Sequence, residues 1–162
     1  MTRLKPVIEL HKHLLQEPAG TYIDAGALLG AIAHCESASG LQREYGRREP
    51  AYAKGGRYYV RHVIDLHKQY GDFVPLSYGS WQVLFIAAWE LGYKDHPSEL
   101  LMDDISLPWV IKFINIRAFD RGASTPKDVF DTYNSGNYKD DIVPFDYISK
   151  AMDFYNENIG NF

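Results

Sequence analysis

The stretch that decides the fold runs from Thr21 to Gly40 and reads TYIDAGALLGAIAHCESASG. Its apolar residues recur at the spacing of one helix face, and they include Ile23, Ala27, Leu28, Ala31, Ile32 and Cys35. Asp24 follows Thr21 by three residues, which predicts a capping box with Asp in place of the usual Glu. Because Gly40 closes the segment, an acidic residue, Glu36, is predicted at the end of an apolar helix.

Helical spacing of apolar residues also covers most of the chain outside this stretch. We predict further helices at residues 4–15, 57–70, 83–91, 97–103, 108–121, 125–135 and from about Pro144 onwards. Pro97 and Pro108 each begin one of them, because a proline in the first turn lacks only a donor that has no partner there. Residues 41–56 are predicted as a loop, and residues 72–82 as irregular chain with at most a short strand near 72–76. The sequence therefore predicts a single all-α domain over residues 1–162, built from about seven to eight helices.

The composition indicates a globular protein without a dedicated nucleic-acid partner. Of its 162 residues, 46% are hydrophobic and 23% are charged, values typical of folded domains. Lys and Arg number 17 against 21 Asp and Glu, for a net charge of −4, whereas nucleic-acid binders usually carry a strongly basic face. No apolar run approaches the roughly 18 residues of a membrane-spanning helix, so we predict no membrane insertion.

The histidines and the single cysteine offer no convincing metal site. His11 and His13 lie two residues apart and His62 and His67 five apart, and neither pair fits a His-Glu-x-x-His motif. We therefore predict no metal and no cofactor, and no Gly-rich loop has the pattern of a phosphate cradle. Cys35 follows a histidine directly, but neighbouring residues on a helix do not face each other, so we predict a small core residue rather than a nucleophile.

Basic residues cluster between Gln42 and Lys68, where seven Lys or Arg stand against three acids. The basic residues are Arg43, Arg47, Arg48, Lys54, Arg57, Arg61 and Lys68, interleaved with Tyr45, Tyr52, Tyr58 and Tyr59. Two interpretations stay open at this point. The segment could hold an anionic polymer by charge and stacking, or it could be a solvated insertion.

Glu36 is the sharpest candidate for chemistry. Partial burial at the end of an apolar helix disfavours a charged carboxylate and raises its pKa, which is what a general acid in a glycosidase requires. A carboxylate near a helix C-terminus is also a common surface residue, so the position alone does not decide the function.

Three short blocks add to this observation. They are Glu36-Ser37, Ser77-Tyr78-Gly79-Ser80-Trp81-Gln82-Val83 and Thr132-Tyr133-Asn134-Ser135-Gly136. In this order they resemble the soluble lytic transglycosylase family, related in fold to goose-type lysozyme, whose blocks read Glu-Ser, Gly-Leu-Met-Gln-Ile and Ala-Tyr-Asn-Ala-Gly. The basic segment lies between the first two blocks, which resembles muralytic domains with an inserted loop at the cleft. The resemblance implies a lysozyme-like fold.

The resemblance also implies a reaction and roles for individual residues. Glu36 would protonate the glycosidic oxygen between N-acetylmuramic acid and N-acetylglucosamine, then act as the base that closes a 1,6-anhydro ring. Ser37 would orient Glu36 or contact the sugar, and Tyr133 would lie near the reacting centre. The substrate-binding residues implied are Ser37, Tyr78, Ser80, Gln82, Tyr133 and Asn134. The acetamido group of the substrate can stabilise the cationic centre, so no protein nucleophile is required.

Two other functions remain open from the sequence. A peptidoglycan hydrolase of the muramidase type needs a second carboxylate to activate water, and Glu44, Glu49 and Asp65 are the candidates. The second is an inactive cell-wall-binding or virion structural domain. In each case the expected partner is the peptidoglycan glycan strand, and we expect a monomer. Since no signal peptide is visible, we expect a phage lysin, a virion-associated domain or a piece of a longer protein that acts on the bacterial cell wall.

Overall fold

The computed structural model describes residues 2–42, 47–139 and 145–162. Within these ranges 61% of the residues are helical, with seven α-helices, so the prediction of a helical fold is confirmed. The small three-stranded sheet departs from the all-α prediction. The α-helices are α1 (Lys5–His11), α2 (Ala25–Ser37), α3 (Arg61–Tyr70), α4 (Phe85–Glu90), α5 (Asp103–Arg117), α6 (Pro126–Ser135) and α7 (Phe145–Asn158). Short 3₁₀ helices are η1 (Lys12–Leu14), η2 (Pro50–Tyr52), η3 (Gly71–Phe73), η4 (Pro97–Leu101) and η5 (Phe119–Arg121). No helix in the described ranges is long and apolar enough to cross a bilayer.

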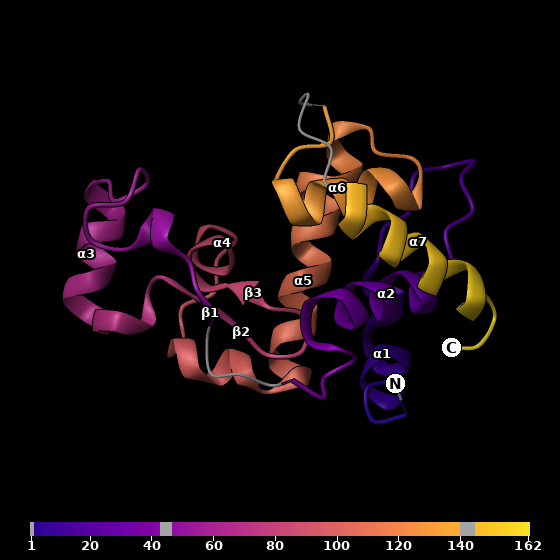
Figure 1. Ribbon diagram of the computed structural model, residues 1–162, viewed down its shortest axis with the longest axis horizontal. Coiled ribbons are helices and arrows are strands. Elements are labelled where there is room, and N and C mark those ends of the chain that lie inside the picture. Colours follow the sequence, from indigo (N-terminus) through magenta and orange to yellow (C-terminus); the bar gives the residue numbers. More distant parts are fainter. Residues whose placement is uncertain (1, 43–46, 140–144) are drawn as a thin grey trace.

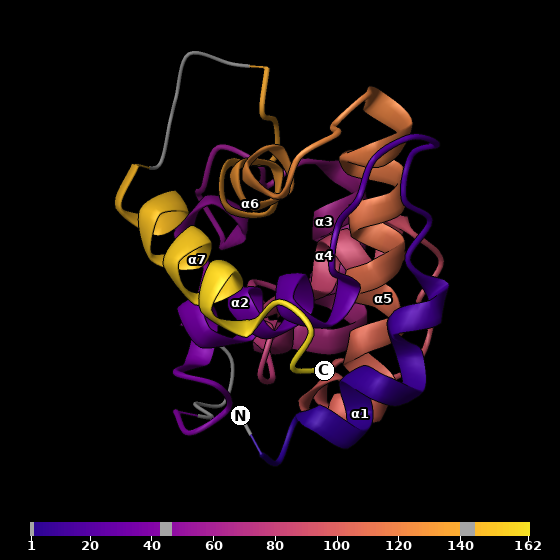
Figure 2. The same ribbon diagram turned by 90° about the vertical axis from the view of Figure 1, so that its right-hand side faces the viewer.

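Helix α2 forms the centre of the core. Its residues from Gly26 to Ala33 are all buried, and α7 lies alongside it in both ribbon views (Figures 1 and 2). Gly26 lets the C-terminal Phe162 pack against α2, because a Cβ at position 26 would collide with the Phe162 side chain. Burial of an apolar helix on all sides fixes α2, and therefore its last turn with Glu36, relative to the rest of the molecule.

A small sheet holds the segment that follows residue 46 in place. Strand β2 (Leu76–Tyr78) lies between β1 (Arg47–Arg48) and β3 (Val83–Leu84), and both pairings are antiparallel. Arg47 is opposite Ser77, so the segment after residue 46 is held beside the middle sequence block. In Figure 1 the sheet lies between α3 at one end of the molecule and α2 with α7 at the other.

Several predicted helix starts are wrong. Asp24, rather than Thr21, caps α2: its Oδ1 accepts the N–H of Ala27 at 2.8 Å, whereas the Thr21 hydroxyl donates to Pro18. The helix predicted from residue 57 begins at Arg61. Val83 and Leu84 belong to β3 instead of the following helix. Strands of two or three residues are too short for alternation to show in the sequence.

Pro108 lies inside α5 and does not begin it, which corrects the prediction. The helix starts at Asp103, one turn earlier. A proline in this position removes the hydrogen bond to the carbonyl of Asp104, and Asp104 is exposed, so water can satisfy that oxygen. The helix predicted at residues 125–135 is confirmed, because α6 runs from Pro126 to Ser135, with a capping box of Thr125 and Asp128 at its start and Gly136, at φ 91°, at its end. The predicted start of the last helix near Pro144 lies outside the described residues.

Candidate active site

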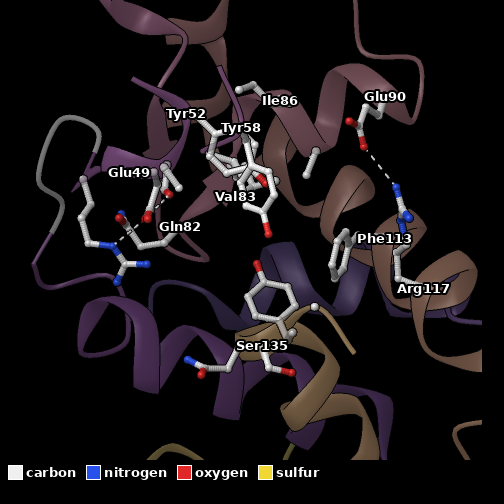
Figure 3. Close-up of a pocket in the computed structure, with 18 of the residues that line it drawn as sticks. Glu49, Tyr52, Tyr58, Gln82, Val83, Ile86, Glu90, Phe113, Arg117 and Ser135 are labelled. Atoms are coloured by element: carbon white, nitrogen blue, oxygen red, sulfur yellow. Dashed lines mark hydrogen bonds and ion pairs between the residues drawn. The ribbon is translucent and has the colours of Figure 1, made fainter. Parts of the chain in front are cut away.

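A cleft of about 580 Å³ collects residues from all three sequence blocks. Glu36 reaches it from the end of α2, Gln82 from the turn before β3, and Tyr133 with Asn134 from the end of α6. In Figure 3, Glu49 and Gln82 mark one end, Glu90 and Arg117 the other, and Tyr52 and Tyr58 face Ser135 across the gap. The blocks that the sequence separates are therefore neighbours around one cavity.

Glu36 is the most buried carboxyl group in this cleft, with 7% of its side chain exposed. Burial raises the pKa of Glu36, while the Tyr147 hydroxyl and the Arg47 guanidinium oppose this effect. The chain directly after α2 is strained, because Ala38 and Ser39 have φ of 48° and 62°, a region costly for residues with a Cβ. The left-handed turn at Ala38 ends the helix at Ser37, so Glu36 is the second-last residue of α2.

Arg47 connects Glu36 to a second carboxylate. Its Nη1 lies 3.7 Å from Glu36 Oε2, and its Nε donates to Glu49 Oε1 at 3.0 Å. The same Glu49 oxygen accepts the hydroxyl of Ser77 at 3.0 Å. The β1–β2 register explains this arrangement, since it sets Arg47 opposite Ser77. Two carboxylates in the cleft thus share one guanidinium.

Tyr147, on α7, is a site residue that the sequence analysis missed. Its hydroxyl is buried close enough to the Glu36 carboxyl to lower the pKa of Glu36, although among the described residues no contact of this hydroxyl has the full geometry of a hydrogen bond. Burial raises the pKa of Tyr147 well above its usual value, and the nearby Glu36 carboxyl raises it further. In the sequence Tyr147 is only one member of the apolar face of the last helix, so no local signal indicated it.

Close packing and hydrogen bonds hold the turn from Gly79 to Gln82 in place. A Cβ at Gly79, which has φ of 73°, would lie 2.7 Å from the carbonyl oxygen of Leu100. The Trp81 indole is fully buried and donates to the carbonyl of Leu29 at 2.9 Å. Gln82 adopts φ of 48° and donates its amide N–H to Gly79 at 2.9 Å. An amide has a second donor and an acceptor oxygen, and the side chain lines the cleft.

The C-terminal end of α6 supplies the opposite wall. The Tyr133 hydroxyl donates to the carbonyl of Trp81 at 2.6 Å, which ties α6 to the turn. Burial raises the pKa of Tyr133, and the nearby Glu36 carboxyl adds to this. Asn134 is exposed at the mouth of the cleft, where its amide is accessible to a ligand.

Three residues that the resemblance assigned to substrate contact do not line the cleft. Tyr78 is 2% exposed and its hydroxyl donates to the carbonyl of Phe73, and the fully buried Ser80 donates to Asp103 Oδ1 at 2.7 Å. Ser37 is also buried, donating to the carbonyl of Ser80 at 2.6 Å and accepting the N–H of Gly40 at 2.8 Å. All three hydroxyls are hydrogen-bonded within the protein and stabilise the loops around the cleft.

The candidates for a second catalytic carboxylate differ in their position relative to the cleft. Glu49 lines the cleft, whereas Asp65 is an exposed residue of α3 that pairs with Lys68 at 2.7 Å. Glu44 lies outside the described residues. Glu90, which the sequence analysis did not single out, lines the far end of the cleft and pairs with Arg117 at 3.1 Å.

Cys35 and the histidines do not line the cleft, although His62 Nε2 lies 3.7 Å from Oε1 of the cleft residue Glu90. His34 stacks on Phe154 with ring centroids 4.6 Å apart. Cys35 packs against the core, as predicted, and burial raises the pKa of its thiol to about 11. Within residues 2–42, 47–139 and 145–162, no three His, Cys, Asp or Glu side chains are grouped as ligands for a metal ion.

Comparisons with known proteins give no relative for this chain. No protein-family model matches it, and neither a curated protein nor a solved structure matches it significantly. The assignment of a function therefore depends on the residues of the cleft.

Proposed function

We propose that the chain is a peptidoglycan lytic transglycosylase with a lysozyme-like helical fold, acting on the bacterial cell wall. The observation that carries the proposal is the position of Glu36, nearly buried in a cleft that Gln82, Tyr133 and Asn134 also line. A buried acid retains its proton at a pH at which an exposed carboxyl group has lost it. All three sequence blocks contribute residues to this cleft.

In the proposed reaction Glu36 first donates its proton to the glycosidic oxygen between N-acetylmuramic acid and N-acetylglucosamine. The acetamido group of the muramic acid stabilises the cationic carbon that forms. The deprotonated Glu36 then removes the proton from the 6-hydroxyl of the same sugar. That oxygen bonds to the carbon and gives a 1,6-anhydro product without water.

The surrounding side chains support both halves of this cycle. Burial favours the acid form of Glu36, and Arg47 together with the Tyr147 hydroxyl stabilises the carboxylate left after proton transfer. Gln82 and Asn134 are suited to bind the N-acetyl and hydroxyl groups of the sugar, because amides both donate and accept. Tyr133 is anchored to Trp81 and borders the reacting position.

A muramidase is the second candidate, and Glu49 is the observation that favours it. This carboxylate lines the same cleft and shares Arg47 with Glu36. It is therefore the described acid best placed to activate a water molecule, as hydrolases with two carboxylates require. The ends of the product distinguish the two reactions, since hydrolysis leaves a reducible muramic acid and the mass of one added water.

The deciding experiment is mass spectrometry of purified peptidoglycan after digestion by the wild-type protein, Glu36→Gln and Glu49→Gln. We expect 1,6-anhydromuramyl ends from the wild type and from Glu49→Gln. We expect Glu36→Gln to lose activity by about 10²–10⁴-fold, because the amide cannot transfer the proton. The matched control is Glu157→Gln, an exposed glutamate outside the cleft, which should retain full activity.

Other outcomes would contradict the proposal. Reducible ends that disappear in Glu49→Gln would establish the muramidase. A folded wild-type protein that binds peptidoglycan without releasing any fragment would establish a binding or virion structural domain instead. Full activity of a folded Glu36→Gln variant would remove Glu36 from the reaction.

A further inference from the structure

Three arginines line the cleft, and two of them are neutralised within the protein. Arg47 pairs with Glu36 at 3.7 Å and with Glu49 at 3.0 Å. Arg117 pairs with Glu90 at 3.1 Å, and Figure 3 shows this pair at the far end of the cleft. The remaining arginine, Arg57, has no carboxylate within 4.0 Å in the part of the chain that the structure describes.

Arg57 instead contacts an aromatic side chain. Its guanidinium carbon lies 4.7 Å from the centre of the Tyr58 ring, a cation–π contact that leaves the N–H groups free to donate. The Tyr52 ring lies 5.1 Å from that of Tyr58. A hydrogen bond of 2.8 Å from the Tyr58 N–H to the carbonyl of Ala51 closes this loop. The guanidinium of Arg57 therefore lies at the cleft, over the Tyr58 ring.

We infer that Arg57 is the binding site for a carboxylate on the substrate, carried by the 3-O-lactyl substituent of muramic acid. This inference rests on the proposed function, because muramic acid is what distinguishes the glycan of peptidoglycan from neutral chitin chains. A planar guanidinium matches a carboxylate with two parallel hydrogen bonds. The carboxylate belongs either to the free lactyl group or to a stem peptide attached to it.

The inference also assigns different roles within the basic segment. Arg47 and Arg57 line the cleft, whereas Arg48, Lys54, Arg61 and Lys68 do not. Arg43 and Tyr45 lie outside the described residues. Recognition of the anionic wall thus depends on one positioned guanidinium at the rim and not on the summed charge of the segment.

Binding and cleavage of three defined tetrasaccharides of alternating N-acetylglucosamine and N-acetylmuramic acid test this inference. The first carries free lactyl carboxylates, the second carries stem peptides, and in the third each lactyl carboxylate is converted to a neutral methylamide. Calorimetry in a Glu36→Gln background measures affinity without turnover, and kcat and KM are measured with Glu36 intact. The variants are Arg57→Gln, Arg57→Lys and, as a matched control, Arg121→Gln, an exposed arginine outside the cleft.

We expect Arg57→Gln to weaken binding of a carboxylate-bearing glycan about tenfold, or ~1.4 kcal/mol, through KM and with little change in kcat. Binding of the neutral methylamide should stay within about twofold of the parent. The affinity of Arg57→Lys for the carboxylate-bearing glycan should lie between those of the parent and Arg57→Gln, because lysine keeps the charge and loses the paired hydrogen-bond geometry. A loss on the first glycan identifies the lactyl carboxylate, and a loss confined to the second identifies the peptide.

Equal losses on charged and neutral glycans, or losses no larger than those of Arg121→Gln, would overturn the inference. The inference would also be overturned if the protein bound none of the three glycans. The proposed function fails differently: the wild type would then bind the charged glycan through Arg57 and leave it uncleaved.

Discussion

The Tyr133 hydroxyl donates a 2.6 Å hydrogen bond to the main-chain oxygen of Trp81, 52 residues earlier in the chain. Gln82 follows Trp81 directly and Asn134 follows Tyr133, so this contact holds the cleft residues Gln82 and Asn134 at a fixed separation. Because Trp81 is fully buried and bonded to α2 through Leu29, the position of α6 is tied to the same core as Glu36.

Removal of this hydroxyl should loosen the cleft. We expect Tyr133→Phe to lower the free energy of unfolding by about 1–3 kcal/mol, because the Trp81 carbonyl loses its donor in a buried place. The matched control is Tyr138→Phe, which removes a 2.8 Å hydrogen bond to the carbonyl of Arg121 at the surface and should cost less. Urea unfolding of both variants measures the difference, and equal costs would contradict the structural role of Tyr133.

Two variants at Gln82 should distinguish the cost of its backbone conformation from the function of its side chain. Its φ of 48° costs a residue with a Cβ roughly 1–2 kcal/mol, a penalty that glycine avoids. Gln82→Gly and Gln82→Ala both lose the amide and should both bind and cleave glycan poorly. We expect Gln82→Gly to be the more stable of the two by about 1 kcal/mol. A more stable Gln82→Ala variant in thermal unfolding would contradict this conformation.

Arg47 should control the pH range in which Glu36 acts as an acid. The guanidinium stabilises the ionised carboxylate and so lowers the pKa of Glu36 against the raising effect of burial. Loss of this charge in Arg47→Gln should raise that pKa further, and the alkaline limb of the kcat profile should move to higher pH. Arg48→Gln is the control, because Arg48 does not line the cleft. An alkaline limb that stays in place or moves to lower pH would contradict the pairing.

Asp103 should stabilise the turn that carries Gln82. Its carboxylate, with 7% of the side chain exposed, accepts from Ser80 at 2.7 Å and from Arg3 at 2.7 Å. We expect Asp103→Ala to cost about 1–3 kcal/mol of unfolding free energy, because the buried Ser80 hydroxyl loses its acceptor. Asp104→Ala changes the same charge in the same helical turn at an exposed position and should cost less than about 0.5 kcal/mol. Similar unfolding curves for the two variants would be evidence against this role.

Features that depend on neighbours in the chain were readable from the sequence. The apolar repeat of α2 predicted a helix with Glu36 near its end, and helical spacing predicted the helix at residues 125–135 that the structure has as α6. Helix spacing and capping arise from residues three or four positions apart. Pro108 shows the limit of such rules, since the sequence alone does not distinguish a helix start from a position one turn further in.

The sequence by itself determined the helical class of the fold, the location of Glu36 at a helix end and the three blocks that meet at the cleft. Only the tertiary structure decided that Arg47 and Tyr147 lie beside Glu36, that Tyr78 and Ser80 face the core, and that Arg57 lines the rim. The reason is that side-chain direction and charge pairing depend on the packing of elements far apart in the chain. Helical periodicity describes one element at a time.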